Sequence, residues 1–370
     1  LEKKIKRKEK LCLQKKNKKG NEISQEDIRK VISKWTGIPI NTLGSKEISS
    51  LLKLEENLEK KVIGQNEACK VVSSAIKRAR TGISDTERPW ASFLFLGPTG
   101  VGKTELAKVL TKELFGDEDR LIQIDMSEMM EMHSVSKLIG SPPGYIGYQQ
   151  GGWLTEKVRR QPHSVILFDE VEKAHIDVLN VLLQILDYGH LTDGKGRRVN
   201  FKNTVIILTS NIGAEEIRKS KVLGFVGKGV SSRSDKEIDD AYTSMKNDLL
   251  IELKNSLRPE LLNRIDDIVI FRSLTRKDAK KIVKLLIGEL NERLSEENVT
   301  ISFDNDVILS IVKEGFSDEY GARPLRRLLQ DKVENILADY LLKQGRLGGN
   351  YEKLEIRLGM KDNKIFVLDK

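Results

Sequence analysis

Short runs of apolar residues recur along the first three quarters of the chain. They predict strands over residues 92–96, 121–125, 165–170, 205–211 and 268–271. Apolar runs of this length, with little or no polar alternation, are typical of strands buried on both faces, as in a parallel sheet. The pattern therefore predicts a central, mostly parallel sheet.

Between these runs, apolar residues recur at every third or fourth position, as on one face of a helix. Leu106, Leu110 and Leu114 predict a helix directly after the first strand. A shorter helix is predicted over residues 51–60. A further helix ends near Gly82, and one face of it consists of Ala68, Val71, Val72, Ala75, Ile76 and Ala79. Strands that alternate with helices indicate an α/β fold.

The pattern changes after residue 273. A capping box at Thr275 and Asp278 begins a helix, further helices are predicted near residues 306–314 and 324–344, and strands 354–358 and 364–368 form a closing hairpin. We therefore divide the chain into three parts. Residues 1–45 are a basic linker or helical connection from a preceding module, residues 46–273 are a large α/β domain, and residues 274–370 are a small α+β domain.

A glycine-rich segment follows the first strand and fits the pattern G-x-x-x-x-G-K-[ST] at every fixed position. It consists of Gly97, Pro98, Thr99, Gly100, Val101, Gly102, Lys103 and Thr104. Between a buried strand and a helix, backbone N–H groups and the positive end of the helix dipole cradle phosphate oxygens. The lysine then reaches the β- and γ-phosphates, and the threonine hydroxyl binds Mg²⁺. The segment predicts a site for a nucleoside triphosphate.

Polar residues follow two of the other strands. Asp169 and Glu170 end the strand that begins at residue 165, where ligands bind in open parallel sheets. This position suits Asp169 to the Mg²⁺ shell and Glu170 to polarising the attacking water. Asn211 ends the next strand and has two interpretations: it orients that water, or it caps the following helix.

The charge of the chain is unevenly distributed. The formal net charge is +9, but residues 1–20 hold ten Lys or Arg and two Glu, which leaves about +1 for the remaining 350 residues. A nucleic-acid-binding protein is expected to carry positive charge on a folded face or groove, so we expect no nucleic-acid partner.

No apolar run has the length of a membrane span. Two cysteines, Cys12 and Cys69, argue against a disulfide framework and for a reducing compartment. The charged start of the chain predicts a piece cut from a longer protein.

Three further features have alternative interpretations at this stage. Residues 140–152 are rich in Gly and Pro and display Tyr145 and Ile146, which either fold back onto the core or act at the surface. Arg264 and Arg323 by themselves are ordinary candidates for surface salt bridges.

These residues together resemble the Clp family of AAA+ protein unfoldases, specifically its second ATPase module. The resemblance rests on residues 97–104, 165–170, Asn211, residues 263–266 and residues 321–324, and it runs from about residue 31 to 369. It implies an AAA+ P-loop NTPase fold, in which a three-layer α/β/α large domain precedes a small α+β lid domain.

The resemblance also implies roles for individual residues. Lys103 and Thr104 are similar to the nucleotide-binding pair, Asn211 to the first sensor and Arg323 to the second. Arg264 resembles the arginine finger, which in this family reaches the ATP of the neighbouring subunit. Further positions are Asp169 and Glu170 as the metal-binding and hydrolytic carboxylates, Val62 and Ile63 in the adenine pocket, and Tyr145 and Ile146 in a pore loop that grips polypeptide.

The implied activity is ATP-driven threading of polypeptides through the pore of a homo-hexamer, with ATP and Mg²⁺ as cofactors. The tripeptide Leu223, Gly224 and Phe225 resembles the segment with which protease-linked members dock on the ClpP peptidase. It favours the ClpC type, with adaptor proteins as further partners, in a bacterial cytoplasm or plastid stroma. The alternatives are a ClpB-type disaggregase without a peptidase, a DNA-remodelling AAA+ motor, and a nucleotide-binding scaffold without turnover.

Overall fold

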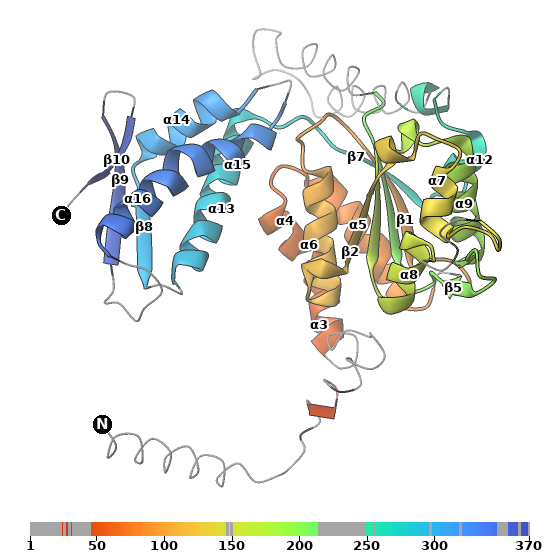
Figure 1. Ribbon diagram of the computed structural model, residues 1–370. Helices are drawn as coiled ribbons and strands as arrows, with labels where there is room; N and C mark the ends of the chain where they lie inside the picture. The colour runs from red at the N-terminus through yellow and green to blue at the C-terminus, as the bar shows by residue number, and fades with distance from the viewer. Residues whose placement is uncertain are drawn as a thin grey trace.

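The computed structural model describes residues 24, 27, 28, 31, 46–83, 85–145, 148, 151–213, 249, 251–254, 256–295, 298–317, 320–345, 354–361 and 364–368. Within these ranges, no helix is both long and apolar enough to cross a membrane. The predicted N-terminal part, residues 1–45, lies almost entirely outside the described residues. The described chain forms a large part around one sheet and a smaller C-terminal part beside it (Figure 1).

The large part is built on a five-stranded parallel sheet with the strand order β2-β3-β6-β1-β7. The strands are β1 (Ala91–Leu96), β2 (Leu121–Asp125), β3 (Val165–Asp169), β6 (Val205–Ser210) and β7 (Asp267–Ile270). All five predicted strands are confirmed. Because the strands are parallel, the polar residues that follow β3 and β6 emerge at the same end of the sheet as the loop after β1.

Successive residues of the central strands pack into two different hydrophobic clusters. Phe93 and Phe95 of β1 enter one cluster and Leu94 and Leu96 the other. One face is covered by α4 (Leu54–Lys61), α5 (Asn66–Arg80) and α6 (Lys103–Phe115), and the other by α7 (Ser134–Ile139), α8 (Trp153–Arg160), α9 (Ile176–Tyr188) and α12 (Pro259–Leu262) (Figure 1). Helix layers on both faces bury the central strands β1, β3 and β6, which explains their uninterrupted apolar runs. The predicted three-layer α/β/α architecture is confirmed.

Local details of the large part differ from the sequence prediction. The predicted helix over 51–60 is two helices, α3 (Lys46–Leu52) and α4, because Lys53 has a turn conformation between them. A short antiparallel pair, β4 (His190–Thr192) and β5 (Arg198–Asn200), follows α9 and was not predicted. Each of its strands has three residues, too few to form a recognisable alternating pattern.

The C-terminal part combines helices with a small sheet around its own hydrophobic cluster. Its helices are α13 (Arg276–Ser295), α14 (Asn305–Gly315), α15 (Arg323–Leu329) and α16 (Asn335–Lys343), and a π-helical turn, Gln330–Glu334, joins the last two. The predicted hairpin is present as β9 (Leu354–Lys361) and β10 (Lys364–Leu368). A third strand, β8 (Val299–Phe303), pairs in parallel with β9. The α+β character is confirmed, although the prediction missed this third strand.

The two parts meet beside the glycine-rich loop. The carbonyl oxygen of Gly100 accepts a hydrogen bond from the Ala322 N–H at 3.0 Å, just before α15. The buried side chain of Gln65 donates to the carbonyl oxygens of Val101 and Arg272 at 3.0 and 2.9 Å, and accepts from the Arg272 N–H at 3.2 Å. Gln65 therefore joins the loop to the segment that leads from β7 into α13.

Candidate nucleotide site

The glycine-rich loop, residues 97–102, turns from β1 into α6 at the carboxyl end of the sheet. Gly100 has φ +75°, and a Cβ atom there would lie 2.1 Å from the carbonyl oxygen of Tyr320. Only glycine adopts this conformation readily and leaves room for that close approach. The loop can therefore lie directly against the C-terminal part of the chain.

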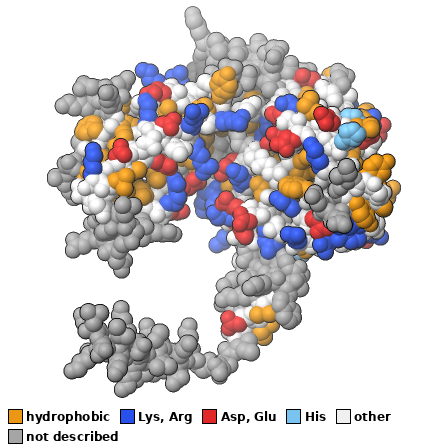
Figure 2. Space-filling model, in the orientation of Figure 1, with side chains coloured by type: hydrophobic (Ala, Val, Ile, Leu, Met, Phe, Trp, Pro, Cys, Tyr) orange, Lys and Arg blue, Asp and Glu red, His pale blue; other side chains and the backbone are white. Residues whose placement is uncertain are grey.

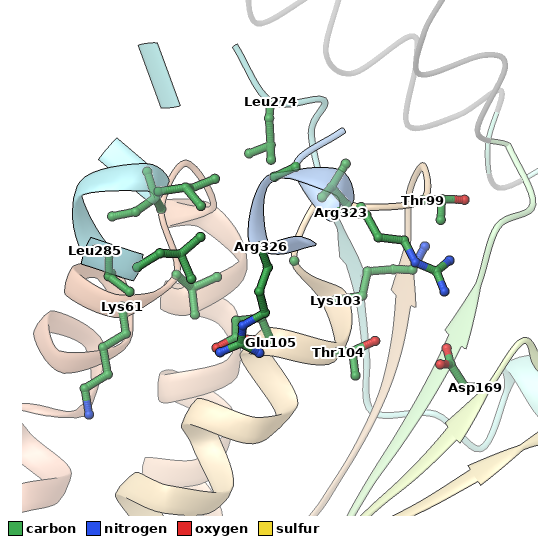
Figure 3. A pocket seen from close by; sticks show the side chains of 18 of the residues that line it. Lys61, Thr99, Lys103, Thr104, Glu105, Asp169, Leu274, Leu285, Arg323 and Arg326 are labelled. Carbon is green, nitrogen blue, oxygen red and sulfur yellow. The ribbon is translucent and has the colours of Figure 1, made fainter. Parts of the chain in front are cut away.

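A cavity of about 470 Å³ opens beside this loop, between the two parts of the chain (Figure 3). Its size falls within the range of small-molecule sites. Most of the predicted nucleotide residues line it, namely Val62, Ile63, Thr99, Gly100, Val101, Gly102, Lys103, Thr104, Asp169, Glu170, Asn211 and Arg323. Gly97 and Pro98 do not line it, but their carbonyl oxygens accept hydrogen bonds from Lys103.

Lys103 begins α6 and is only 8% exposed. Its ammonium group donates to the carbonyl oxygens of Gly97 and Pro98 at 2.6 and 3.2 Å and to Oδ1 of Asn211 at 2.8 Å. Burial lowers the pKa of Lys103 to about 8, although nearby carboxylates favour the charged form. A desolvated cation next to the glycine-rich loop is suited to binding phosphate.

The two predicted acidic residues are held by a threonine of the neighbouring strand. Thr209, next to last in β6, donates its hydroxyl to Oδ1 of Asp169 and accepts the backbone N–H of Glu170 at 3.1 Å. Glu170 has φ +58°, which is uncommon for a residue other than glycine. Its carboxylate also forms an ion pair with Lys173 at 2.5 Å, and this pairing raises the pKa of Lys173. The geometry of both carboxylates is therefore fixed by contacts outside their own strand.

Asn211 connects the lysine to the glutamate. Its side-chain oxygen accepts from Lys103 at 2.8 Å, and its Nδ2 group donates to Oε1 of Glu170 at 3.1 Å. Its backbone N–H donates to Oε1 of Glu172 at 3.1 Å. These contacts favour the first of its two interpretations, in which the Asn211 side chain acts inside the site.

The C-terminal part supplies the other wall of the cavity. Arg323 extends from α15 toward Lys103 and Asp169, and Arg326 lies one helical turn further along (Figure 3). Four apolar side chains of this part, Leu274, Ile282, Leu285 and Leu286, also line the cavity, and Leu274 and Ile282 belong to the same hydrophobic cluster as Val62. The cavity thus has a charged end next to the glycine-rich loop and an apolar end that suits a planar base.

The side chains present fit both predicted cofactors. Charged and backbone donors at one end and an apolar wall at the other match the two ends of a nucleoside triphosphate. Thr104 and Asp169 line the same cavity and offer one hydroxyl and one carboxylate. Mg²⁺ is usually bound through one or two carboxylates together with substrate phosphates, so this small donor set is sufficient for it.

Two predicted residues lie elsewhere in the structure. Arg264 does not line the cavity; its side chain is 51% exposed and forms an ion pair with Asp187, at the end of α9, at 2.7 Å. Tyr145 is 70% exposed in the loop between α7 and α8, and it also lies away from the cavity. Ile146, Leu223, Gly224 and Phe225 lie outside the described residues.

Comparisons with known proteins agree with this arrangement. A family model described as the AAA domain (Cdc48 subfamily) matches residues 88–268, and a model of the C-terminal, D2-small domain of ClpB protein matches residues 274–352. A relative from Staphylococcus epidermidis, an ATP-dependent Clp protease ATP-binding subunit ClpC, is 52% identical over 327 residues. The chain belongs to the Clp family of AAA+ ATPases.

The match covers most of this chain but less than half of its relatives. With the S. epidermidis protein it includes 88% of this chain and 39% of the relative. A Staphylococcus aureus protein of the same name is 50% identical over 333 residues, which are 90% of this chain and 40% of that relative. The chain therefore spans about two fifths of the length of the curated relatives it matches.

Several residues of the site were not predicted from the sequence. Ile282, Leu285 and Leu286 form part of the apolar face of α13. An apolar helix face can either line a cavity or pack in the hydrophobic core, and the sequence alone does not distinguish the two. Arg326 lies three residues after Arg323, and this spacing on one helix face is a signal that was available. Other residues that line the cavity or bond to its residues, and that were not predicted from the sequence, are Lys61, Glu105, Gln123, Glu172, Lys173, Thr209, Leu274, Glu289 and Ala322.

Proposed function

We propose that this chain binds ATP with Mg²⁺ and hydrolyses it to drive the unfolding and threading of polypeptides. The observation that carries the proposal is the chain of contacts from Lys103 through Asn211 to Glu170 inside the cavity. These contacts support the roles proposed for the three residues: Lys103 as a phosphate-binding cation, Asn211 as a polar sensor and Glu170 as a carboxylate base. We further propose that the large and lid domains are residues 46–273 and 274–370.

Most of the predicted residues that line the cavity have a defined role in this proposal. The loop backbone and Lys103 hold the phosphates, Val62 and Ile63 contact the adenine, and Glu170 takes a proton from the attacking water. Thr104 and Asp169 hold Mg²⁺, which when bound neutralises phosphate charge. Arg323 carries the nucleotide state to the lid domain, since it reaches the site from α15.

We propose that the catalytic unit is a ring, with six copies as the family expectation. Arg264 is half-exposed and lies outside the cavity of its own chain, which is the position expected of a residue that serves a neighbouring copy. Arginine fingers supplied in this way are worth about 10³–10⁵ in rate. A site of this kind is incomplete in a single chain.

The proposed substrate is unfolded polypeptide, gripped by Tyr145 and Ile146. The exposure of Tyr145 supports this role, because an aromatic side chain offers a large contact area with few rotatable bonds. On the face shown in Figure 2, Lys and Arg side chains are interspersed with Asp and Glu, which gives no support to a DNA-remodelling motor.

The relatives are named as subunits of a Clp protease, which favours ClpP as a partner and Leu223, Gly224 and Phe225 as its docking segment. Adaptor proteins are a further proposed class of partner. Both relatives come from staphylococci, which favours the bacterial cytoplasm over the plastid stroma. A ClpB-type disaggregase remains the alternative, and loss of ClpP co-purification on Phe225→Ala separates the two.

The decisive experiment measures ATP hydrolysis with and without an unfolded polypeptide, with DNA as the control. We expect stimulation by polypeptide and none by DNA. Tyr145→Ala is expected to abolish threading of a fluorescent substrate while nucleotide binding stays within about twofold of wild type, because Tyr145 lies outside the cavity. Unchanged threading in this variant would refute the role given to the loop.

A further inference from the structure

Glu172 lies in the short 3-10 turn Val171–Lys173 that directly follows β3 and its acidic end. It is half-buried and does not line the cavity. Its Oε1 atom accepts the backbone N–H of Asn211 at 3.1 Å. Two segments that are about 40 residues apart in the sequence are joined by this bond.

The position of Asn211 explains why this bond matters. The pairing between β3 and β6 ends at Phe168 and Leu208, and the pairing between β1 and β6 ends at Leu96 and Ser210. Asn211 therefore follows the last paired residue of β6, and neither ladder supplies a partner for its N–H. A partly buried backbone donor without an acceptor is unfavourable, and Glu172 provides the acceptor.

The second oxygen of Glu172 strengthens the case for a specific role. Oε2 is buried and has no hydrogen-bond partner among the described residues. Burying a carboxylate oxygen without a partner is unfavourable, and the positive charges of Lys103 and Lys173 offset part of that cost. An acidic side chain kept half-buried at such a cost is expected to have a function beyond filling space.

We propose that Glu172 is a positioning residue for ATP hydrolysis: it fixes the backbone of Asn211 so that the amide side chain bridges Lys103 and Glu170. The side-chain oxygen of Asn211 meets Lys103 at 2.8 Å and its nitrogen meets Glu170 at 3.1 Å, so a shift of the Asn211 backbone disturbs both contacts together. This inference rests on the proposed function and adds a residue that does not line the cavity and acts on the site through Asn211.

Two conservative variants separate the hydrogen bond from the charge. Glu172→Gln keeps an acceptor oxygen at the same distance from the backbone and removes the charge, whereas Glu172→Asp keeps the charge and is one methylene shorter. Glu172→Ala removes both. The matched control is Glu128→Ala, an exposed glutamate in the 3-10 turn Met126–Met129, which packs against the turn that holds Glu172.

The first measurement is steady-state ATP hydrolysis by the full chain. We expect Glu172→Ala and Glu172→Asp to lower kcat about tenfold, as supporting partners of site residues commonly do, while KM changes less than about twofold. Glu172→Gln is expected to retain most of the wild-type kcat, and the Glu128 control all of it. An Asp variant more active than the Gln variant would overturn the proposal, and so would an Ala variant with wild-type kcat.

The second measurement is hydrogen exchange of the Asn211 amide in protein without nucleotide. We expect faster exchange in Glu172→Ala and Glu172→Asp and wild-type protection in Glu172→Gln; equal protection in all variants would overturn the proposal. If the Ala variant does not fold, the Gln and Asp pair decides. A wild-type chain without ATPase activity would refute the proposed function, and the exchange data would still decide whether Glu172 holds Asn211.

Discussion

The two ends of the central sheet each bury a titratable group, but the surroundings of the two groups differ. At the carboxyl end, Lys103 donates three hydrogen bonds and faces a cavity. At the amino end, His163 packs edge-on against Trp90 and Phe115, and its Nδ1 atom has no hydrogen-bond partner among the described residues. One group belongs to a polar network and the other to an aromatic cluster.

Burial lowers the pKa of both groups, that of Lys103 to about 8 and that of His163 to about 4. A lowered pKa therefore does not by itself distinguish a binding site from packing. The hydrogen bonds do so: those of Lys103 lead to Asn211 and from there to Glu170, whereas the charges of Arg80 and Arg120 near His163 only disfavour its protonation.

The largest effect is expected at the carboxyl end. Glu170→Gln replaces the proposed base by an amide of the same shape, so we expect kcat for ATP to fall about 10²–10⁴-fold while ATP still binds. Hydrolysis assays and a nucleotide-binding titration measure the two quantities. Glu128→Gln, at an exposed position, is the control. Normal turnover in the Glu170 variant would remove its assigned role.

The second prediction concerns how His163, at the amino end of the sheet, makes the stability of the protein depend on pH. His163 has a folded-state pKa of about 4, below its ordinary value of 6.5, so it favours the folded state only while it is neutral. Its contribution is complete above pH 6.5 and is lost as the pH falls toward 4. After a discount for partial solvent screening, we expect a loss of about 2 kcal/mol in the free energy of unfolding.

Urea unfolding of wild type and His163→Gln between pH 4 and 7.5 measures this contribution. The stabilities of the two proteins should differ most at high pH and converge as the pH falls, because only wild type loses the contribution of a neutral histidine. Parallel pH profiles would show that His163 is not buried as described. ATP binding by the variant at pH 7.5 should match wild type, since His163 is absent from the cavity.

The last effect, of comparable size, is expected at Gln65, which makes three hydrogen bonds where the two parts of the chain meet. Gln65→Leu leaves the backbone groups of Val101 and Arg272 without these partners, so we expect the free energy of unfolding to fall by about 1–3 kcal/mol. The exposed ion pair of Arg78 with Asp267 is the matched comparison, and Arg78→Gln should cost less than about 1 kcal/mol. Equal losses in the two variants would contradict this ranking.

Most of the fold followed from local patterns in the sequence. The five strands of the parallel sheet were predicted from apolar runs, because a strand that helices cover on both faces is mostly apolar. The glycine-rich segment and the acidic pair were predicted for a related reason: each lies within a few residues of the strand end that positions it. Prediction was weaker where a segment is short, as in β4 and β5, or where it pairs only with a distant partner, as β8 does with β9.

The sequence by itself determined which chemical groups occupy the ends of the strands, because strand, loop and helix N-terminus are set by residues that are neighbours in the chain. Only the tertiary structure decided which of these groups touch. The hydrogen bonds that join Asn211 to Lys103, Glu170 and Glu172 connect residues that are 39 to 108 positions apart in the sequence. The apolar side chains of α13 line the cavity only because the C-terminal part docks beside Gly100. Contacts of this kind depend on packing between distant segments, and no local pattern in the sequence encodes them.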